Sequence, residues 1–454
     1  MIDNSRLPFD LPAVRRKKLT VAFDGGRLSS DGGLLLLREA ERRTGINHRL
    51  AGIIRDRRAP DRIEHTMPEL FNTRVFAICC GHSDANDLDR LRDDPLLKMA
   101  VGRRPDTDPP LCSQSTMSRL ENMPTKIEAA RLTAALVDHF CASFEAPPAE
   151  MMLDIDDTVD EVHGMQQLSF WNAHYDCRCF LPIHVYHVES GKPVVAFLRE
   201  GKTPAGCEIR TILRHLTKRI RRHAPTTRIT YRGDSHYGRC EVMDWAESND
   251  VSYIFGFAGN SKLDALVRET ADNLRYRHAL GCADKMRTYA SFSYRAKSWS
   301  KPRRIIARLE ASLLPGVNGM RQEVDIRYCV TSLEGSAQHL YEEVYCKRGQ
   351  AENLIKMHKA QMASDRTSCR SPAANQVRLV LHTAAYWILH TLRAAVPPKS
   401  PLAMADFATI RLRLIKIAAR IVEFGHRIRV FLPTACPERA VFKAVAKGLM
   451  PAEP

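Results

Sequence analysis

The sequence lacks the features of a membrane protein, an exported protein or a zinc protein. No apolar run approaches the roughly 18 residues that a membrane-spanning helix needs. The N-terminal stretch MIDNSRLPFDLPAVRRKK has no apolar core like that of a signal peptide. The 13 cysteines include no CxxC pair, and Cys79–Cys80 and Cys177-x-Cys179 are too closely spaced for a zinc site. These absences predict reduced thiols and a cytoplasmic protein with no membrane partner.

Two catalytic motifs are also missing, whereas positive charge is plentiful. The 17 histidines form no HExxH group, and no GxxxxGK[ST] loop is present, so neither a zinc hydrolase nor a nucleotide cofactor is expected. The chain has 454 residues and a formal charge of +16, from 68 Lys and Arg against 52 Asp and Glu. This length predicts two or three domains. The charge indicates a polyanionic partner, most simply nucleic acid, with a ribosome-associated or membrane-surface protein as the competing interpretation.

Residues 1–148 are predicted to form a mainly helical accessory module that binds DNA. Helical hydrophobic patterns occur at 30–43, 67–80, 85–99 and 126–144. A short helix between prolines, within PPLCSQSTMSRLENMP, carries Arg119 and several Ser, Thr and Gln side chains of the types that contact DNA. A capped connector between helices explains the same stretch, so both interpretations of Arg119 remain open. EAPPAE, at 145–150, marks the predicted boundary.

Residues 149–395 predict an α/β domain. MMLDIDD indicates a buried strand that ends in acids, and a hairpin, a helix, a strand in TRITYRGDSHYG, a second helix and the strand VSYIFGF follow it. This order predicts a sheet whose first three strands are antiparallel. A β-rich insertion at about 258–335 precedes the helix of the segment YCKRGQAENLIKMHK.

Residues 396–454 are predicted to form a basic helical C-terminal region. Two long amphipathic helices are expected at about 373–395 and 402–424. From residue 393 to the end, eleven Lys and Arg stand against four acids. This region is therefore either a second DNA surface or a solvated helical face.

Four polar side chains of YCKRGQAENLIKMHK share one face of the predicted helix. At about 100° per residue, Tyr345, Arg348, Glu352 and Lys359 fall within an arc of about 60°. This edge can bind a metal ion through Glu352 and phosphates through the other three side chains. The alternative is an exposed helix with an ordinary Arg348–Glu352 pair at i,i+4.

Three acidic sites match the needs of metal-dependent phosphoryl transfer. They are the acids that end MMLDIDD, Asp234 in YRGDSHYG, and Glu352. Two divalent ions held by carboxylates from neighbouring elements activate the nucleophile and stabilise the leaving oxygen. Taken singly, an acid after a strand often caps the next turn. In the strand, alternation places Asp154 and Asp156 on one face and Asp157 on the other.

These residues resemble a known family. Tyr345-x2-Arg348-x3-Glu352-x6-Lys359 is similar to the Y-R-E-K signature of DDE transposases from bacterial insertion sequences, and LDIDDT and YRGDSHYG look like their first two acid regions. SDGGLLLL, TMSRLEN, DTVDEVHG and DRTSC resemble the insertion sequence 1380 family, within the insertion sequence 4-like superfamily. The likeness runs from about residue 18 to residue 432.

The resemblance implies an RNase H-like core with an inserted β subdomain, acting on double-stranded DNA at terminal inverted repeats. It implies strand cleavage and strand transfer that depend on Mg²⁺ or Mn²⁺, two ions being expected, in a homodimer or larger assembly. Asp156, Asp234 and Glu352 would be the catalytic metal ligands. Asp156 is preferred to Asp157 because Thr158 follows it by two positions, as in the family's pattern. Tyr345, Arg348 and Lys359 would hold the phosphates that flank the cut.

Two questions remain open at this stage. Trp299 lies in a basic stretch of the insertion, where similar transposases stack an aromatic ring on a flipped base, but packing of the insertion explains it equally well. The second question is the reaction itself. An RNase H-like nuclease that cuts without joining shares every acid, and a DNA-binding protein that has lost catalysis is the third alternative.

Overall fold

The computed structural model describes residues 12–281, 284–316 and 319–450, which form two compact units. One unit comprises 1–123 and 384–454, and the other comprises 124–383. Most of the N-terminal stretch MIDNSRLPFDLPAVRRKK, which lacks the apolar core of a signal peptide, lies outside the described residues. In the described part of the chain, no helix is long and apolar enough to cross a membrane.

The unit made of 124–383 is built on an eight-stranded mixed sheet in the order β10-β11-β12-β9-β8-β2-β6-β7. Its strands are β2 (Glu150–Asp157), β6 (Ile183–His187), β7 (Lys192–Phe197), β8 (Arg228–Gly233), β9 (Val251–Phe257), β10 (Lys285–Tyr294), β11 (Arg303–Gly316) and β12 (Gly319–Thr331). β2, β6 and β7 pair antiparallel, whereas β2, β8 and β9 run parallel. The predicted α/β class and the antiparallel start of the sheet are confirmed.

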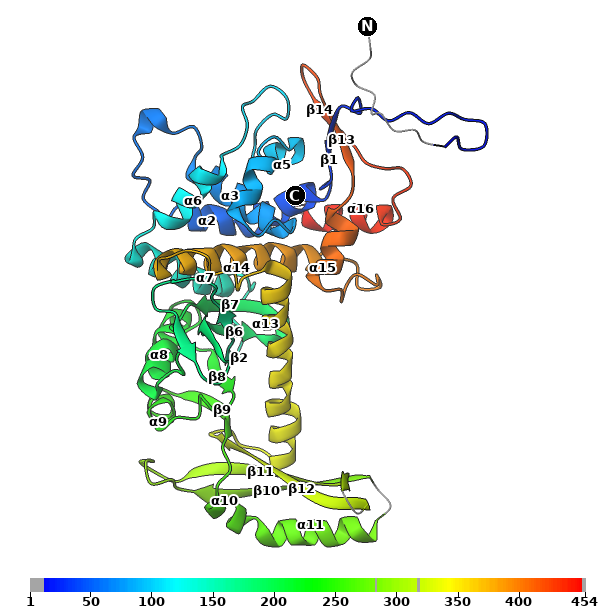
Figure 1. The fold of residues 1–454 in the computed structure, drawn as a ribbon. Helices are drawn as coiled ribbons and strands as arrows, with labels where there is room; N and C mark the ends of the chain where they lie inside the picture. The colour runs from blue at the N-terminus through cyan, green and yellow to red at the C-terminus, as the bar shows by residue number, and fades with distance from the viewer. Residues whose placement is uncertain (1–11, 282–283, 317–318, 451–454) are drawn as a thin grey trace. The chain divides into compact units, whose positions relative to one another are not determined.

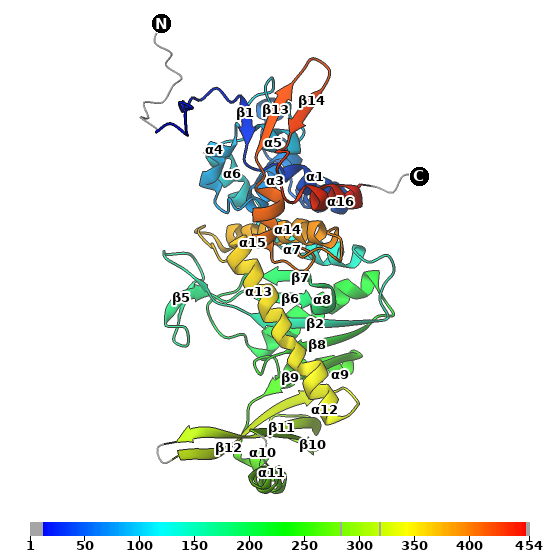
Figure 2. The same cartoon turned by 90° about the vertical axis from the view of Figure 1, so that its right-hand side faces the viewer.

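Helices cover both faces of this sheet (Figures 1 and 2). In both views α13 lies on one face, and α8 and α9 lie on the other. The helices of this unit are α7 (Lys126–Ala142), α8 (Gly206–His223), α9 (Cys240–Ser248), α10 (Ser261–Leu266), α11 (Arg268–Leu280), α12 (Ala337–His339), α13 (Gly349–Met362) and the first part of α14 (Pro372–Ala394). Short strands β3 (Asp160–Glu161), β4 (Phe170–Asn172) and β5 (Cys177–Phe180) form a separate small sheet.

β2 is central because its residues are buried on both faces. Met151, Leu153 and Ile155 are at most 1% exposed, and Asp154 between them is equally buried. An apolar run without strict alternation is typical of a strand covered on both sides. β2 thereby carries its terminal acids to the edge of the sheet formed by the strand ends.

The β-rich insertion extends the central sheet. β12 pairs with β9 through Tyr328–Thr331. A buried cluster then joins the insertion to the start of the helical segment that follows it: Ile254, Ile306, Cys329, Leu340 and Tyr341. The insertion therefore helps to position the helix that carries the Y-R-E-K residues.

The other unit combines the two ends of the chain. Its elements are β1 (Arg27–Ser29), α1 (Leu34–Thr44), α2 (Ile46–Ala51), η1 (Pro60–Arg62), α3 (Met67–Cys79), η2 (Ala85–Asp87), α4 (Leu88–Leu91), α5 (Pro95–Ala100), α6 (Gln114–Asn122), the rest of α14, α15 (Phe407–Ile410), β13 (Ala419–Glu423), β14 (Ile428–Phe431) and α16 (Arg439–Leu449). The β1-β13-β14 sheet joins these two ends, because it pairs segments far apart in the sequence. The predicted boundaries at 148 and 395 stay predictions.

The helix predicted at 402–424 is wrong. The helical stretch ends at Ile415, and β13 begins at Ala419 to pair with β1. The N–H of Gly32 donates to the Ile417 carbonyl at 2.7 Å, and that of Gly33 donates to the Ile415 carbonyl at 3.1 Å. A Cβ on Gly33 would lie 2.1 Å from the Leu414 carbonyl oxygen, so only glycine permits this approach.

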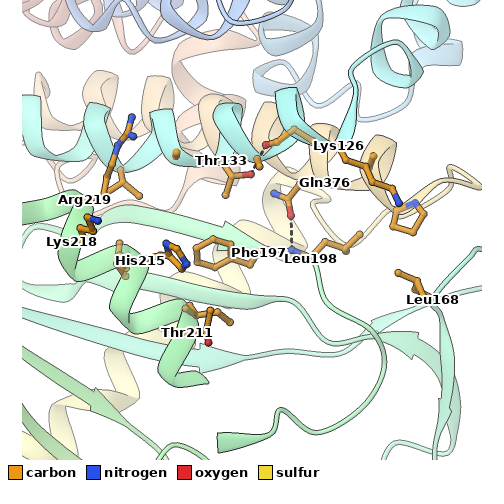
Figure 3. A pocket seen from close by; sticks show the side chains of 18 of the residues that line it. Lys126, Thr133, Leu168, Phe197, Leu198, Thr211, His215, Lys218, Arg219 and Gln376 are labelled. Carbon is orange, nitrogen blue, oxygen red and sulfur yellow. Dashed lines mark hydrogen bonds between the residues drawn. The ribbon is translucent and has the colours of Figure 1, made fainter. Parts of the chain in front are cut away.

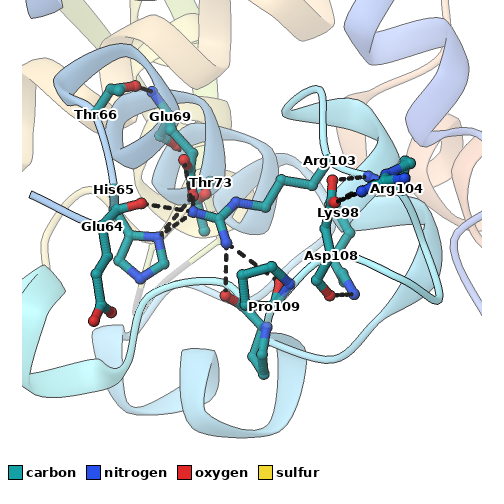
Figure 4. A network of polar contacts seen from close by, with 11 residues as sticks. Glu64, His65, Thr66, Glu69, Thr73, Lys98, Arg103, Arg104, Asp108 and Pro109 are labelled. Atoms are coloured by element: carbon teal, nitrogen blue, oxygen red, sulfur yellow. Dashed lines mark hydrogen bonds and ion pairs between the residues drawn. The ribbon is translucent and has the colours of Figure 1, made fainter.

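The helix predicted at 85–99 is divided into η2, α4 and α5, and Asp94 caps α5 at Leu97 N. The loop after α5 is ordered by polar contacts that Figure 4 shows. Buried Lys98 donates to the carbonyls of Pro105 and Asp108 at 2.8 and 2.7 Å. Arg103 donates to the Glu69 carboxylate at 3.1 Å, which ties the loop to α3.

Candidate active site

The first two acid regions meet at one edge of the sheet. β2 and β8 are parallel, with Ile155 opposite Gly233, so the following residues, Asp156 and Asp234, lie at the same level. The carboxyl ends of neighbouring parallel strands are where open α/β sheets bind ligands. The fold therefore brings together two acids that are 78 residues apart.

The three acids at the end of β2 have different surroundings. Asp154 is 1% exposed and accepts two hydrogen bonds from Arg232, at 2.6 and 2.7 Å. Asp156 pairs across the strands with His184, on the face that α13 covers. Asp157 accepts a hydrogen bond from the Tyr237 hydroxyl at 3.4 Å. Because Arg232 occupies both oxygens of Asp154, that acid acts in folding rather than at the site.

Arg348 connects the first acid to the third. Its Nη1 donates to Asp156 Oδ2 at 3.0 Å, and its Nη2 lies 2.8 Å from Glu352 Oε1. The Asp156 side chain is 13% exposed and that of Glu352 is 56% exposed. One guanidinium thus contacts two carboxylates, one from β2 and one from α13.

The acids at this edge interact electrostatically. The pKa of Asp156 is raised to about 7, mainly by burial; Arg348 lowers it, and the charges of Asp234, Asp157 and Glu352 raise it. Burial and the charge of Asp234 also raise the pKa of Asp157. Crowded carboxylates of this kind need a cation close by.

The residues present fit a divalent metal by their chemistry. Carboxylate oxygens are the hard ligands that Mg²⁺ and Mn²⁺ take, and repulsion among Asp156, Asp234 and Glu352 would be relieved by a dication. Within the described ranges, no three acidic, His or Cys side chains already stand in the arrangement of a metal site. Arg348 supplies the neutralising charge in this structure.

The helical segment that carries the Y-R-E-K residues is irregular. Leu340–Tyr345 (η4) is π-helical, Cys346–Arg348 (η5) is 3₁₀-helical, and α13 follows from Gly349. The uniform 100° step used on the sequence does not hold here. Arg348 and Lys359 nevertheless both reach the residues that end or follow β2.

Lys359 is held by the turn after β2. Its Nζ donates to Thr158 Oγ1 at 3.1 Å and to the Val159 carbonyl, and lies 3.5 Å from the buried Asp160 carboxylate. These contacts fix the backbone directly beyond Asp157. The predicted contact of Lys359 with a phosphate stays a prediction.

Tyr345 lies beside the second acid. Asp234, Arg348, Tyr345 and Gly256 line one cleft of about 490 Å³. A cleft of about 410 Å³ is lined by other parts of the site: Asp156, Asp157, Thr158, Glu352, Ile355, Lys356, Lys359, Ala360 and Asp365. Burial raises the pKa of the Tyr345 phenol, which therefore stays protonated at neutral pH as a hydrogen-bond donor.

Trp299 packs the insertion in this structure. Its indole is 4% exposed and lies 5.3 Å from the Phe257 ring and 5.7 Å from the Tyr294 ring, with the Arg303 guanidinium 5.3 Å away. Stacking on a flipped base would require the indole to leave this cluster. The geometry therefore favours packing, the second of the two roles considered for Trp299.

Arg119 belongs to the unit that contains both chain ends. Its side chain is exposed on α6, as expected for either a DNA contact or a connector. Its role in DNA binding stays a prediction.

The sequence also contained residues of the site that were not singled out. Arg232 and Tyr237 flank Asp234 in the same segment and contact Asp154 and Asp157. A carboxylate on a strand buried on both faces requires a cationic partner, so the YRG sequence held a usable signal for Arg232.

Two comparisons found known proteins that are similar to this chain. The family model described as "Transposase DDE domain group 1" matches residues 11–454. Among solved structures, the cryo-EM structure of the piggyBac transposase synaptic complex with hairpin DNA is similar, at 12% identity and a TM-score of 0.39. That alignment covers 86% of this chain and 80% of the piggyBac chain. A comparison with curated proteins found no match. Because the family match spans nearly the whole chain, the protein belongs to the transposase DDE domain group 1 family and is a DDE transposase.

Proposed function

We propose that the protein binds the terminal inverted repeats of an insertion sequence and catalyses metal-dependent strand cleavage and strand transfer. The observation that carries this proposal is the alignment of Asp156 with Asp234 at two parallel strand ends, with Glu352 linked to Asp156 through Arg348. An RNase H-like core is part of the proposal. The strand order β7-β6-β2-β8-β9, antiparallel and then parallel, supports it.

Asp156, Asp234 and Glu352 would hold the divalent ions, Mg²⁺ or Mn²⁺. When bound, these ions supply Lewis acidity to both phosphoryl transfers. The carboxylates would hold the ions at the strand ends, and Arg348 offers the scissile phosphate a planar fork that matches its oxygens. Lys359 and the Tyr345 hydroxyl add a charge and a donor on the same helical segment. Water cleaves one strand, and the freed 3′-hydroxyl then attacks target DNA in line.

The DNA partner and the assembly also belong to this proposal. A net charge of +16 favours binding to a polyanion, and the exposed Arg119 on α6 is one contact that we propose. Joining two DNA ends to one target favours a homodimer or a larger complex. Assignment to the insertion sequence 1380 family of bacteria rests on the sequence motifs.

The test compares wild-type protein with Glu352→Ala. Each is incubated with Mg²⁺ or Mn²⁺, a labelled DNA that carries the flanking inverted repeats, and a plasmid target. We expect wild type to nick at the repeat end and to join that end to the plasmid, and Glu352→Ala to do neither. Glu343→Ala is the matched control, because Glu343 is 59% exposed and contacts Lys347 one turn before the site.

The other outcomes discriminate the rival functions. Nicking without joining would identify a nuclease with the same core. Binding to the repeats with neither reaction would identify a DNA-binding protein that has lost catalysis. Equal activity of Glu352→Ala and wild type would show that Glu352 has no part in the reaction and would contradict the proposed three-acid site.

A further inference from the structure

A groove of about 970 Å³ opens in the unit that contains the acids, but none of the acids lines it (Figure 3). It lies between α7 and α8, and is closed by the end of β7 and the start of α14. This volume is at the upper end of the range for ligand pockets. The transposase reaction as proposed above assigns it no role.

The floor of the groove is apolar and made largely of small side chains. α7 contributes Ala129, Ala130, Thr133, Ala134 and Val137. Larger apolar side chains complete the lining: Leu168, Phe197, Leu198, Ile212 and Leu216. Two polar side chains of the groove already have hydrogen-bond partners. Gln376 Oε1 accepts from Leu198 N at 2.7 Å, and Thr133 Oγ1 donates to the Ala129 carbonyl.

The rim of the groove is cationic. It carries Lys126, His215, Lys218, Arg219 and Arg222, and no Asp or Glu is among the described residues that line it. In Figure 3 Lys126 lies at one end of the groove, and Lys218 and Arg219 lie at the other. Asp138 pairs with Arg219 at 2.6 Å. Lys218 and Arg222 are exposed, and within the described residues neither forms an ion pair.

These features together select one kind of occupant. From Lys126 to Val137 the α7 wall is about 16 Å long at about 1.5 Å per residue, which is three helical turns. Small side chains on a helix allow another helix to approach closely, and helices bind grooves through apolar residues at i, i+3, i+4 and i+7. The phosphates of duplex DNA could contact the cationic rim, but duplex DNA has no apolar surface that would cover the floor of the groove.

We propose that the α7–α8 groove binds an amphipathic α-helix of a partner protein, with acidic residues flanking its apolar stripe. The stripe covers the alanine floor, and the acids meet Lys126 at one end and Lys218 and Arg222 at the other. The transposase would thereby recruit an acidic partner at a surface separate from its acids. This inference does not depend on the strand-transfer chemistry.

The test uses full-length protein and a synthetic, end-capped 15-residue helix with leucines at i, i+3, i+4 and i+7 and glutamates on both flanks. A second peptide has lysine in place of each glutamate. Binding is followed by fluorescence anisotropy at about physiological salt. We expect the acidic peptide to bind at least about tenfold more tightly than the lysine peptide, a difference of about 1.4 kcal/mol. Equal binding of the two peptides would overturn the proposal.

Variants then locate the bound peptide. Ala130→Trp fills the floor, and the double variant Lys218→Glu/Arg222→Glu reverses part of the rim. Each is expected to weaken the acidic peptide about tenfold with an unchanged circular dichroism spectrum. Arg210→Glu is the control, because Arg210 is exposed on α8 but does not line the groove. An equal loss in this control, or displacement of the peptide by duplex DNA, would show non-specific attraction or a DNA surface, and would overturn the proposal.

Discussion

Arg348 donates to Asp156 across 3.0 Å, although 192 residues separate them in the sequence. The same guanidinium reaches Glu352 at 2.8 Å. This ion pair holds α13 against the end of β2, and the charge of Arg348 lowers the pKa of Asp156, which burial and the neighbouring acids raise. In the free protein Arg348 therefore stabilises the packing of α13 through its ion pairs. Under the proposed function it binds a phosphate in the DNA complex.

Arg348→Ala should lower the rate of single-turnover nicking by about 10²–10³-fold, the usual effect of removing one charge-stabilising donor from an active site. Arg348→Lys should recover only part of this loss, because an ammonium keeps the charge but not the two-pronged geometry. The neighbouring variant Lys347→Ala serves as the control, since Lys347 contacts the exposed Glu343. A wild-type rate for Arg348→Lys would argue that only charge matters.

Asp156→Asn should stabilise the protein at about pH 8 in the presence of a chelator. Burial raises the pKa of Asp156 from 3.8 to about 7, so between these values the folded state binds more protons than the unfolded chain. Stability therefore falls as the pH rises through this window and stays lower above it. Because Asp156→Asn cannot ionise, its free energy of unfolding should exceed that of wild type by about 1–3 kcal/mol at pH 8 and by little near pH 4. Urea unfolding at both pH values measures this, and a variant less stable at pH 8 would contradict it.

Mn²⁺ should raise the melting temperature of wild type more than that of Asp156→Asn or Asp234→Asn. A ligand that binds only the folded state raises the free energy of unfolding by about 2.7 kcal/mol when its concentration is a hundred times its Kd. The amide variants lose one anionic ligand each and should show a smaller shift. Melting curves with and without Mn²⁺ test the site without any measure of activity. Equal shifts in all three proteins would place the ion elsewhere.

Asp154→Ala should destabilise the protein strongly, unlike Asp156→Asn. Removing one partner of a buried ion pair costs about 3–5 kcal/mol because the other charge is left uncompensated. Arg232, 4% exposed at its side chain, would be that charge. The double variant Asp154→Leu/Arg232→Met should recover much of the loss in chemical denaturation. If Asp154→Ala were as stable as wild type, the ion pair would not contribute to folding.

Trp299→Ala should lower the stability by about 3–5 kcal/mol, as for other buried aromatic residues replaced by alanine. The matched control is Trp171→Ala. Trp171 is 62% exposed, so its replacement should lower the stability only slightly. Nicking at the repeat end, measured per folded molecule, should change little in Trp299→Ala. A stable variant with a specific loss of cleavage would return Trp299 to the stacking role.

Much of the site could be predicted from the sequence because its signals are local. Helical periodicity predicted that Arg348 and Lys359 lie on one side of the segment, and both do reach the end of β2 although the helix is irregular at Leu340–Arg348. The apolar run of β2 predicted a buried strand that ends in acids. Even the separation of Asp156 from Asp157 follows from alternation, and the structure confirms it through the different partners of the two acids.

Tertiary structure decided the points that depend on residues distant in the sequence. Local periodicity favoured a helix at 402–424, but β1 offers a pairing edge from the opposite end of the chain, and Gly32 and Gly33 admit the carbonyls that would otherwise clash. Burial of Trp299 depends on Phe257, 42 residues earlier. The roles of Asp154 and Asp156 diverge because Arg232 faces one and Arg348 the other. Sequence patterns indicate which helix or strand a segment can form. Residues far along the chain determine which of its charged and aromatic side chains are buried or paired, and which are left to bind a ligand.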